Sequence, residues 1–291
     1  MMPQVSQDHG STVDIALASW RQGDVCLDTG LEFVHVADLS RPGSNAALYA
    51  AARLKDQGAQ LPTGSISLSE EVPGLVMLTQ TCDIVRPNAV RPYVEVSPLL
   101  HVPVEFVEDV HRLRRPAFAY VPATAKHRLV VDLDRVMTIE KAVVATWNRV
   151  PGWRTDDQAR AFAEALARIR SRFAFPDDFV AITTKLQERL RGRHNRQHSE
   201  GAHLRALREI RVRAAPAWDA HEVALGVWFI KDDEPPSVAA AWSDWVEAWT
   251  ALLDQSGRFQ VEFAVACRLE DLTARDYVES DRLDLNFLSG S

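Results

Sequence analysis

Hydrophobic residues in the first half of the chain recur in short alternating runs, which is the pattern of β-strands. We expect strands at 20–27, 31–38, 75–84, 93–97 and 128–132. The run at 75–84 begins with four apolar residues and continues through Gln80, Cys82 and Ile84, so it is expected to form a hairpin with 93–97. Residues 42–60, which are rich in alanine and leucine, predict a helix inserted among these strands.

The hydrophobic period becomes helical in the second half of the chain. Thr155-Asp-Asp-Gln158 fits a capping box, and the residues after it predict a helix from about 156 to 172. A second helix is expected after Pro176. Strands are expected at 210–214 and 222–230, and the second of these is apolar on both faces, as a central strand of a sheet is.

A third helix is expected after Pro235-Pro236, followed by a strand at 259–267. A strand, a helix and a strand joined by short connections form a βαβ unit. The helix has a stripe of Trp242, Trp245 and Trp249, which we interpret as core packing against the sheet. A stacking platform for nucleic-acid bases and a protein interface are the alternatives.

The change of period near Pro151-Gly152 predicts a domain boundary. A chain of 291 residues is long enough for two domains. We therefore expect an α+β protein whose first domain, residues 1–150, is rich in β-strands and contains the inserted helix. The second domain, residues 151–291, is expected to be smaller, with helices and mixed α/β structure that includes the βαβ unit.

Composition and charge narrow the class of protein. The net charge is −7 and 46% of the residues are hydrophobic, which is typical of a globular protein. The apolar run Ala224 to Ile230 is far shorter than the roughly 18 residues that a membrane span needs. Residues 1–10 are polar where a signal peptide would be apolar. These features predict a cytoplasmic protein that does not bind a membrane.

Charge is distributed unevenly along the chain. Residues 185–213 hold nine basic and three acidic residues, whereas residues 214–291 hold five and fifteen. We call residues 189–213 the basic strip. Its candidates for contact with the phosphates of RNA or DNA are Arg189, Arg191, Arg193 and Arg196. Two alternatives stay open: the arginines pair with the acidic C-terminal third, or the strip binds an acidic protein partner.

The three cysteines, Cys26, Cys82 and Cys267, lie far apart and form no CxxC pair. The sequence therefore predicts neither a zinc site nor a disulfide framework, and we expect no metal and no cofactor. Cys267 alternates with apolar residues, so we interpret it as a small buried hydrophobic side chain.

The most unusual polar residues are Thr79-Gln-Thr-Cys-Asp83, at the end of an otherwise apolar strand. Polar groups that leave a buried strand together need hydrogen bonds or a cleft. One hypothesis makes Cys82 a nucleophile, with a histidine as base and Asp83 to orient that base, and counts Gln80 among the catalytic candidates. The candidate bases are His35 and His101. A ligand-binding cleft is the second hypothesis, and a strand end whose polar side chains satisfy a turn is the third.

Three segments of the first half follow one another in an order shared with a known family. They are Gln22-Gly-Asp-Val25, Gly74-Leu-Val-Met-Leu-Thr79 and Val94-Glu-Val-Ser-Pro-Leu99. Over residues 18–100 the chain resembles the barrel of the PemK/MazF toxins, which implies an SH3-like β-barrel. Members that cleave RNA place an arginine immediately before the apolar strand, where this chain has Val72-Pro73. That role is therefore not transferred, and Arg86 and Arg91 flank the next turn.

A second resemblance lies in the basic strip. Arg193-His-Asn-Arg-Gln-His198 is similar to the signature of HEPN ribonucleases, an arginine and a histidine separated by four residues, the first of them Asn, Asp or His. The resemblance implies that Arg193 and His198 share one helical face over the scissile phosphate.

Two hypotheses for function follow. In the first, the chain is a nucleic-acid-associated module of a bacterial toxin or phage-defence system. Any catalysis would then be metal-independent RNA cleavage, by Arg193 and His198 or by residues 79–83 with Arg86. In the second, the chain is a non-catalytic subunit of a multi-protein bacterial defence complex. It would bind a protein partner through the barrel and the acidic residues 270–284.

Overall fold

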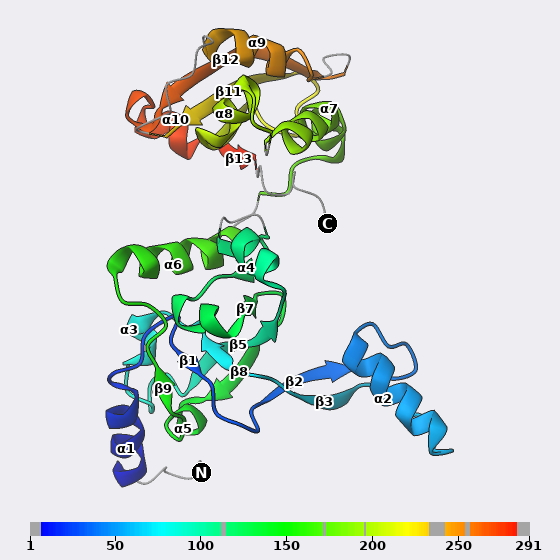
Figure 1. The fold of residues 1–291 in the computed structure, drawn as a ribbon, viewed down its shortest axis with the longest axis vertical. Coiled ribbons are helices and arrows are strands. Elements are labelled where there is room, and N and C mark those ends of the chain that lie inside the picture. Colours follow the sequence, from blue (N-terminus) through cyan, green and yellow to red (C-terminus); the bar gives the residue numbers. More distant parts are fainter. Residues whose placement is uncertain are drawn as a thin grey trace. The chain divides into compact units, whose positions relative to one another are not determined.

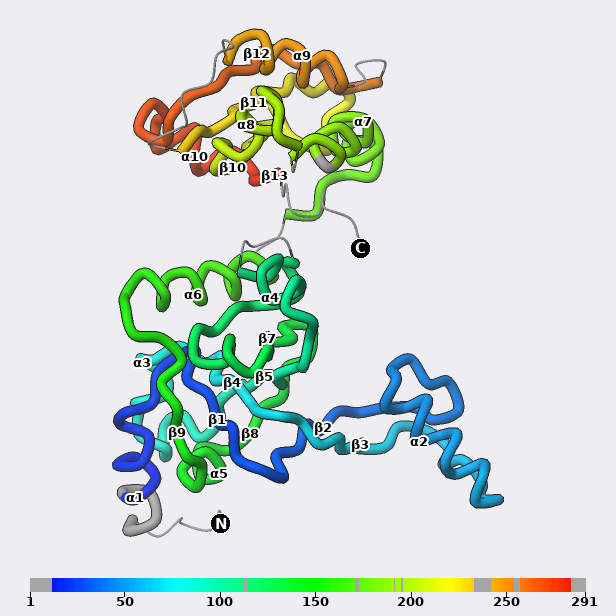
Figure 2. The backbone as a smooth tube through the Cα atoms, viewed as in Figure 1, coloured from blue at the N-terminus to red at the C-terminus, as the bar shows by residue number. Residues whose placement is uncertain are grey.

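The computed structural model divides the chain into two compact units, residues 1–170 and 171–291 (Figures 1 and 2). It describes residues 7–111, 115–170, 173–194, 196–232, 242–253 and 257–283. Both units contain helices and sheets, so the α+β class is confirmed. None of the sheets formed by the described residues closes into a barrel.

The first unit is built on a seven-stranded sheet with the order β6-β7-β5-β4-β1-β9, in which β8 also pairs with β5. The strands are β1 (Val25–Cys26), β4 (Leu75–Met77), β5 (Tyr93–His101), β6 (Phe118–Ala119), β7 (Leu129–Asp132), β8 (Met137–Glu140) and β9 (Arg149–Val150). All of the pairs are antiparallel. The strands expected at 93–97 and 128–132 are present as β5 and β7. The long strand β5 joins the others because successive parts of it pair with β8, β4 and β7.

The strand expected at 75–84 was predicted too long. It ends at Met77, and Thr81–Ile84 forms the single-turn helix α3. Gln80 occupies the N-cap position of α3, and Ile84 on its inner side is buried. The alternation that looked like a strand is thus satisfied by one helical turn between β4 and β5, which still pair as the expected hairpin.

Short helices surround the sheet of the first unit. They are α1 (Gln7–Leu17), α4 (Val104–His111), the 3₁₀ helix η1 (Pro122–His127) and α5 (Lys141–Val144). The longer helix α6 (Asp156–Arg170) was expected at 156–172, and residues 171–172 lie outside the described part. Phe162 and Leu166 of α6 are buried in one cluster with Val25, Val76 and Leu99 of the sheet. This apolar face of α6 covers the sheet of the first unit. The two units therefore divide after Arg170, and not after residue 150, where the sequence predicted the boundary.

A separate arm projects from the sheet of the first unit (Figure 1). It consists of residues 31–72, in which β2 (Glu32–Ala37) and β3 (Ile66–Glu71) pair antiparallel as a two-stranded ribbon. Helix α2 (Asn45–Asp56) was expected within 42–60, and it begins where the Ser44 hydroxyl accepts a hydrogen bond from Ala47 N at 3.2 Å. Leu39, Ala47 and Ala51 are buried together, so the arm has a small core of its own.

The second unit contains a four-stranded sheet with the order β12-β11-β10-β13. Its elements are α7 (Asp177–Arg193), α8 (Ser199–Arg205), β10 (Leu207–Ala215), β11 (Val223–Lys231), α9 (Trp242–Thr250), β12 (Phe259–Arg268), the 3₁₀ helix η2 (Leu269–Asp271), α10 (Ala274–Val278) and β13 (Asp281–Leu283). Strands β11 and β12 are parallel and flank α9 in the chain, which confirms the predicted βαβ unit. The proposed start of that helix at Pro235-Pro236 lies outside the described residues.

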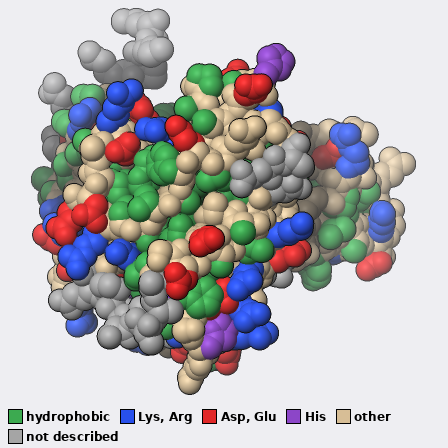
Figure 3. Space-filling view, turned by 90° about the horizontal axis from the view of Figure 1, so that it is seen from above, with side chains coloured by type: hydrophobic (Ala, Val, Ile, Leu, Met, Phe, Trp, Pro, Cys, Tyr) green, Lys and Arg blue, Asp and Glu red, His purple; other side chains and the backbone are tan. Residues whose placement is uncertain are grey.

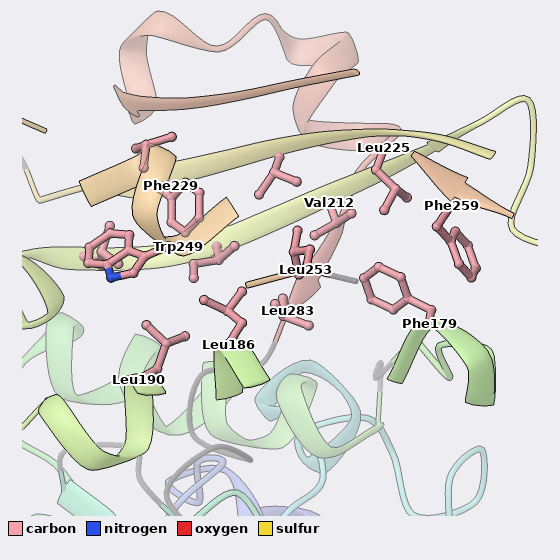
Figure 4. Close-up of a cluster of buried hydrophobic side chains, with 14 of the residues drawn as sticks. Phe179, Leu186, Leu190, Val212, Leu225, Phe229, Trp249, Leu253, Phe259 and Leu283 are labelled. Atoms are coloured by element: carbon pink, nitrogen blue, oxygen red, sulfur yellow. The ribbon is translucent and has the colours of Figure 1, made fainter. Parts of the chain in front are cut away.

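The core of the second unit lies between its helices and one face of the sheet. Figure 4 shows Leu186 and Leu190 of α7 pointing toward the sheet, where Phe229 lies near Trp249 of α9. The rings of Phe229 and Trp249 are 5.3 Å apart, and Trp249 is completely buried. Trp242 and Trp245 pack against the same cluster. The tryptophan stripe is therefore core packing, as interpreted from its spacing.

Candidate functional sites

The two threonines of the 79–83 cluster hydrogen-bond to backbone of the first unit. Thr79 Oγ1 accepts from Glu95 N at 2.7 Å, and Thr81 Oγ1 accepts from Gln22 N at 3.1 Å. Both bonds join segments that are distant in sequence and adjacent in the fold. This part of the cluster satisfies backbone groups around a turn, which was one of the three hypotheses.

The remaining members of the cluster, Gln80, Cys82 and Asp83, lie on α3 and just before it. Cys82 is exposed, and its Sγ lies 3.7 Å from Gln80 Oε1. Asp83 Oδ1 lies 3.4 Å from the Nε of Arg86, so this carboxylate pairs with an arginine and not with a histidine. The structure thus brings the three proposed residues together but gives Cys82 no base among them.

Neither proposed base lies beside Cys82. The backbone of Glu95 is bonded to Thr79, and His101 lies six residues beyond Glu95 on β5. At the rise of a strand, His101 is about 20 Å from Glu95. His35 lies on β2 in the arm, where its ring stacks on Phe33 with centroids 5.7 Å apart. The hypothesis of a Cys–His pair at this place receives no support from the geometry.

Lys141, which the sequence did not identify as a site residue, binds the end of α3 and the loop after it. Its side chain is completely buried, and Nζ donates to the carbonyl oxygens of Asp83 at 2.9 Å and Arg86 at 2.7 Å. Burial lowers the pKa of this ammonium below its ordinary value, although the carboxylates of Asp14 and Asp83 oppose the change. No sequence pattern marks this lysine, because the carbonyls it binds lie more than fifty residues away in the chain.

Arg193 and His198 do not share a helical face, so the arrangement expected from the HEPN signature is wrong. Arg193 is the last residue of α7, whereas His198 is the N-cap of α8. The Nδ1 atom of His198 accepts a hydrogen bond from Gly201 N at 3.0 Å. The helix is interrupted between the two residues, and the histidine stabilises the start of the next helix.

A buried carboxylate joins α7, α8 and α9. Glu200 accepts hydrogen bonds from Arg189 Nε at 2.7 Å and Trp249 Nε1 at 3.2 Å, and Arg193 Nη1 lies 3.8 Å away. Burial alone would raise the pKa of Glu200, but these hydrogen bonds and the charges of Arg189 and Arg193 hold it below its ordinary value. Two of the four proposed phosphate ligands are thus internal partners of one acid that sequence reasoning missed.

Other arginines of the basic strip pair with the C-terminal residues. Arg211 Nε donates to Ser280 Oγ at 2.9 Å and its guanidinium lies 4.0 Å from the ring of Tyr277. Arg213 Nη1 lies 3.2 Å from an oxygen of Asp276. The alternative of pairing with the acidic C-terminal third is confirmed for Arg213, whereas the ion pair of Arg211 is with Glu209 of the strip, at 3.7 Å.

Three arginines of the strip, Arg196, Arg205 and Arg208, are exposed and form no ion pair among the described residues. Arg205 Nη1 donates to the carbonyl oxygens of His194 and Arg196. The side chain of Arg191 lies outside the described part of the chain. The strip therefore offers a smaller basic surface than its sequence indicates.

Two of the three cysteines are enclosed in the fold. Burial, followed by the hydrogen bond to Asp28 at 3.0 Å, raises the pKa of the Cys26 thiol to about 12. Cys267 is buried as expected, and burial raises its pKa to about 11. Within the described ranges, no three His, Cys, Asp or Glu side chains are grouped so that they could hold a metal ion.

Exposed apolar side chains gather on the arm. On the outer face of the ribbon, Val34 and Val36 are 42% and 72% exposed. On the outer side of α2, Leu48 and Tyr49 are 52% and 73% exposed. The arm thus exposes large apolar side chains both on its ribbon and on its helix.

Comparison with known proteins adds no identity. No protein-family model matches the chain, and a search of curated proteins gives no match. Among the described residues, no helix is both long enough and apolar enough to span a membrane.

Proposed function

We propose that this chain is a non-catalytic subunit that binds a protein partner through its arm. The observation that supports this function is the arm itself, a projecting ribbon and helix with Val36 and Tyr49 both more than 70% exposed. Tyrosine is one of the residues enriched among the strongest contributors to protein interfaces. The arm has its own small core, so it can present these side chains on a folded support.

The base of the arm is fixed to the first unit. Phe33 of β2 is buried in the main core, and the Arg135 guanidinium lies 5.3 Å from its ring. Arg135 also pairs with Glu70 of β3 and, at 2.7 Å, with Asp132. An element that is anchored at its base and apolar at its surface is suited to holding a partner in one orientation.

The candidate catalytic residues support a non-catalytic role because most of them stabilise the fold. His198 caps a helix, Arg193 neighbours a buried glutamate, and Asp83 pairs with Arg86. Each of these three residues thus has a contact within the fold. The exposed Cys82 lies in a cluster whose threonines bind backbone.

The biological setting that we propose is a multi-protein bacterial defence or toxin complex in the cytoplasm. It rests on the resemblance of residues 18–100 to the PemK/MazF barrel. The antiparallel neighbours β1, β4 and β5 are compatible with an SH3-like arrangement that is open and not closed. A fold alone does not define a function, so this setting rests on the resemblance, whereas the binding role rests on the exposed side chains of the arm.

The double substitution Leu48→Asp with Tyr49→Asp tests whether the arm binds a partner. Wild type and variant are each expressed at the native level in the source organism and isolated with the proteins bound to them. We expect a protein that co-isolates with the wild type to be absent from this variant. Val278→Asp is the matched control, because Val278 is 82% exposed and lies on α10 of the other unit. All three proteins should melt at similar temperatures, since only exposed side chains change.

Two results would contradict the proposal. One is an unchanged set of partners for the double variant. The other is degradation of RNA by the purified chain in the absence of any partner, which would restore the catalytic hypothesis.

A second candidate function is association with RNA or DNA, favoured by Arg196 and Arg208, which are exposed and form no ion pair among the described residues. If each of them binds a phosphate, its replacement by alanine should lower the slope of log affinity against log salt by about 0.7–0.9. Absence of any affinity for RNA or DNA at low salt would exclude this candidate.

A further inference from the structure

A groove runs between α9 and the edge strand β12 of the second unit. Its volume is about 520 Å³, and its lining includes Val246, Glu247, Thr250, Ala251, Ala264 and Ala266. Figure 3 shows an area of hydrophobic side chains on the face that is seen from above. The lining is mostly apolar, so the groove suits the side chains of another segment of chain.

The main chain of β12 is available for pairing along this groove. In the four-stranded sheet β12 pairs with β11 alone, and within the described residues no strand lies on its other side. After an irregularity near Glu262, the pairing with β11 is regular from Phe263 to Arg268. Alternate residues of such a run direct N–H and C=O groups to the free edge, where an added strand can bind them.

The side chains of the groove leave room beside that edge. Ala264 and Ala266 occupy positions on β12 where larger side chains would close the space against α9. Thr250 Oγ1 is buried and has no hydrogen-bond partner among the described residues. A buried hydroxyl without a partner is costly, and a bound polar group would satisfy it.

The charge near the groove indicates the character of the occupant. Glu247, on the groove, and Glu262, on β12, are both exposed acids. Among the described residues that line the groove, Glu247 alone carries a charge, so the surface that a bound segment meets there is acidic. A basic side chain in the bound segment would complement this surface.

We propose that this groove binds an extended basic peptide segment of a protein partner, which adds to β12 as a further strand of the sheet. Main-chain hydrogen bonds to β12 fix the peptide, and alternate side chains enter the space beside α9. The site lies on a different unit from the arm and does not depend on the function proposed for the arm.

The test uses the full chain and a displayed library of random ten-residue peptides. We expect the selected peptides to be rich in lysine or arginine and to bind through the groove. Ala251→Trp should weaken binding at least about tenfold, because it fills the groove from an exposed position. Glu247→Lys should also weaken it about tenfold or more, because it removes an ion pair with the peptide.

The matched control is Asp244→Lys, which makes the same change of charge on an exposed residue of α9 outside the groove. It should change affinity by less than about twofold at moderate salt. N-methylation of the peptide backbone at alternate positions should abolish binding in one register and be tolerated in the other, because only alternate N–H groups face β12.

Three outcomes would overturn the proposal. Selection without enrichment of any peptide would do so, as would peptides that bind the wild type and Ala251→Trp equally well. The third is a wild-type dimer that Ala251→Trp converts to a monomer, which would make a second copy of the chain the occupant of the groove.

Discussion

At the scale of single residues, the three cysteines differ in their environment far more than their sequence neighbourhoods indicate. Cys26 and Cys267 are buried and Cys82 is exposed on α3. Cys26 follows an apolar residue in a short strand, a neighbourhood that predicts nothing specific, whereas alternation correctly placed Cys267 inside. Cys82 also lies in an alternating run, and only the helical turn at 81–84 places it outside.

These environments predict a single reactive thiol in the native protein. At pH 8 a thiol with a pKa of about 12, as for Cys26, is ionised in only about one molecule in ten thousand, and burial restricts access as well. Iodoacetamide should therefore label Cys82 alone in the folded chain and all three cysteines after unfolding. Cys82→Ser should show no rapid labelling, which mass spectrometry would check. Rapid modification of a second cysteine in the native chain would be inconsistent with the burial of Cys26 and Cys267.

At the scale of elements, hydrophobic spacing predicted the helices and strands that bury one regular face. Phe162 and Leu166 identified α6, and the apolar run in β11 identified the central strand of the βαβ unit. Elements fixed by contacts between distant residues were missed. The turn α3 depends on bonds from Lys141 and Gln22, and neither partner can be read from residues 79–84.

The candidate sites were less predictable than the fold for the same reason. The spacing of Arg193 and His198 matches the HEPN signature. The sequence alone, however, does not distinguish a histidine that caps a helix from one that lies on the same helical face as the arginine. Glu200 is buried because α8 brings it against Trp249, a contact that spans 49 residues. Charge counts located the basic strip, yet the partners of its arginines depend on the packing of α7, α8 and α10.

Because Glu200 joins α7, α8 and α9, the free energy of unfolding should depend on pH through the charge of this residue. Its pKa lies below the ordinary value of 4.5, so the charged form stabilises the fold. That contribution is complete above about pH 4.5 and disappears as the pH falls through the lower pKa of the folded state. Glu200→Gln should lower the free energy of unfolding by about 1–3 kcal/mol at pH 7, because a buried charged acceptor is removed.

The difference between wild type and Glu200→Gln should decrease as the pH falls below about 4.5, which urea unfolding at several pH values would show. Glu188→Gln is the matched control, since Glu188 is an exposed acid of α7, and its unfolding should change by less than about 0.5 kcal/mol. A difference for Glu200→Gln that stays constant from pH 7 to pH 3 would contradict the role of its charge.

At the scale of the whole molecule, the chain consists of two units that each contain a hydrophobic core. The largest cluster of the second unit includes residues of α7, α9 and the sheet, and none from the first 170 residues. In the first unit, α6 closes a cluster formed by β1, β4, β5 and β7. The change of hydrophobic period at Pro151 marks the start of a helical region but not the end of the first unit, because that first helix returns to the earlier sheet.

This arrangement predicts how truncation affects the first unit. A fragment of residues 1–170 should unfold cooperatively, whereas residues 1–150 lack α6 and leave the apolar side chains beneath it exposed to water. We expect the shorter fragment to have a much lower melting temperature or no cooperative transition by circular dichroism. Within the longer fragment, Phe162→Ala should cost about 3–5 kcal/mol, because Phe162 is buried against the sheet. Arg160→Ala, on the exposed face of α6, should cost less than about 1 kcal/mol, since its ion pairs lie in water. Equal stability of the two fragments would show that α6 does not belong to the first unit and would return the boundary to Pro151.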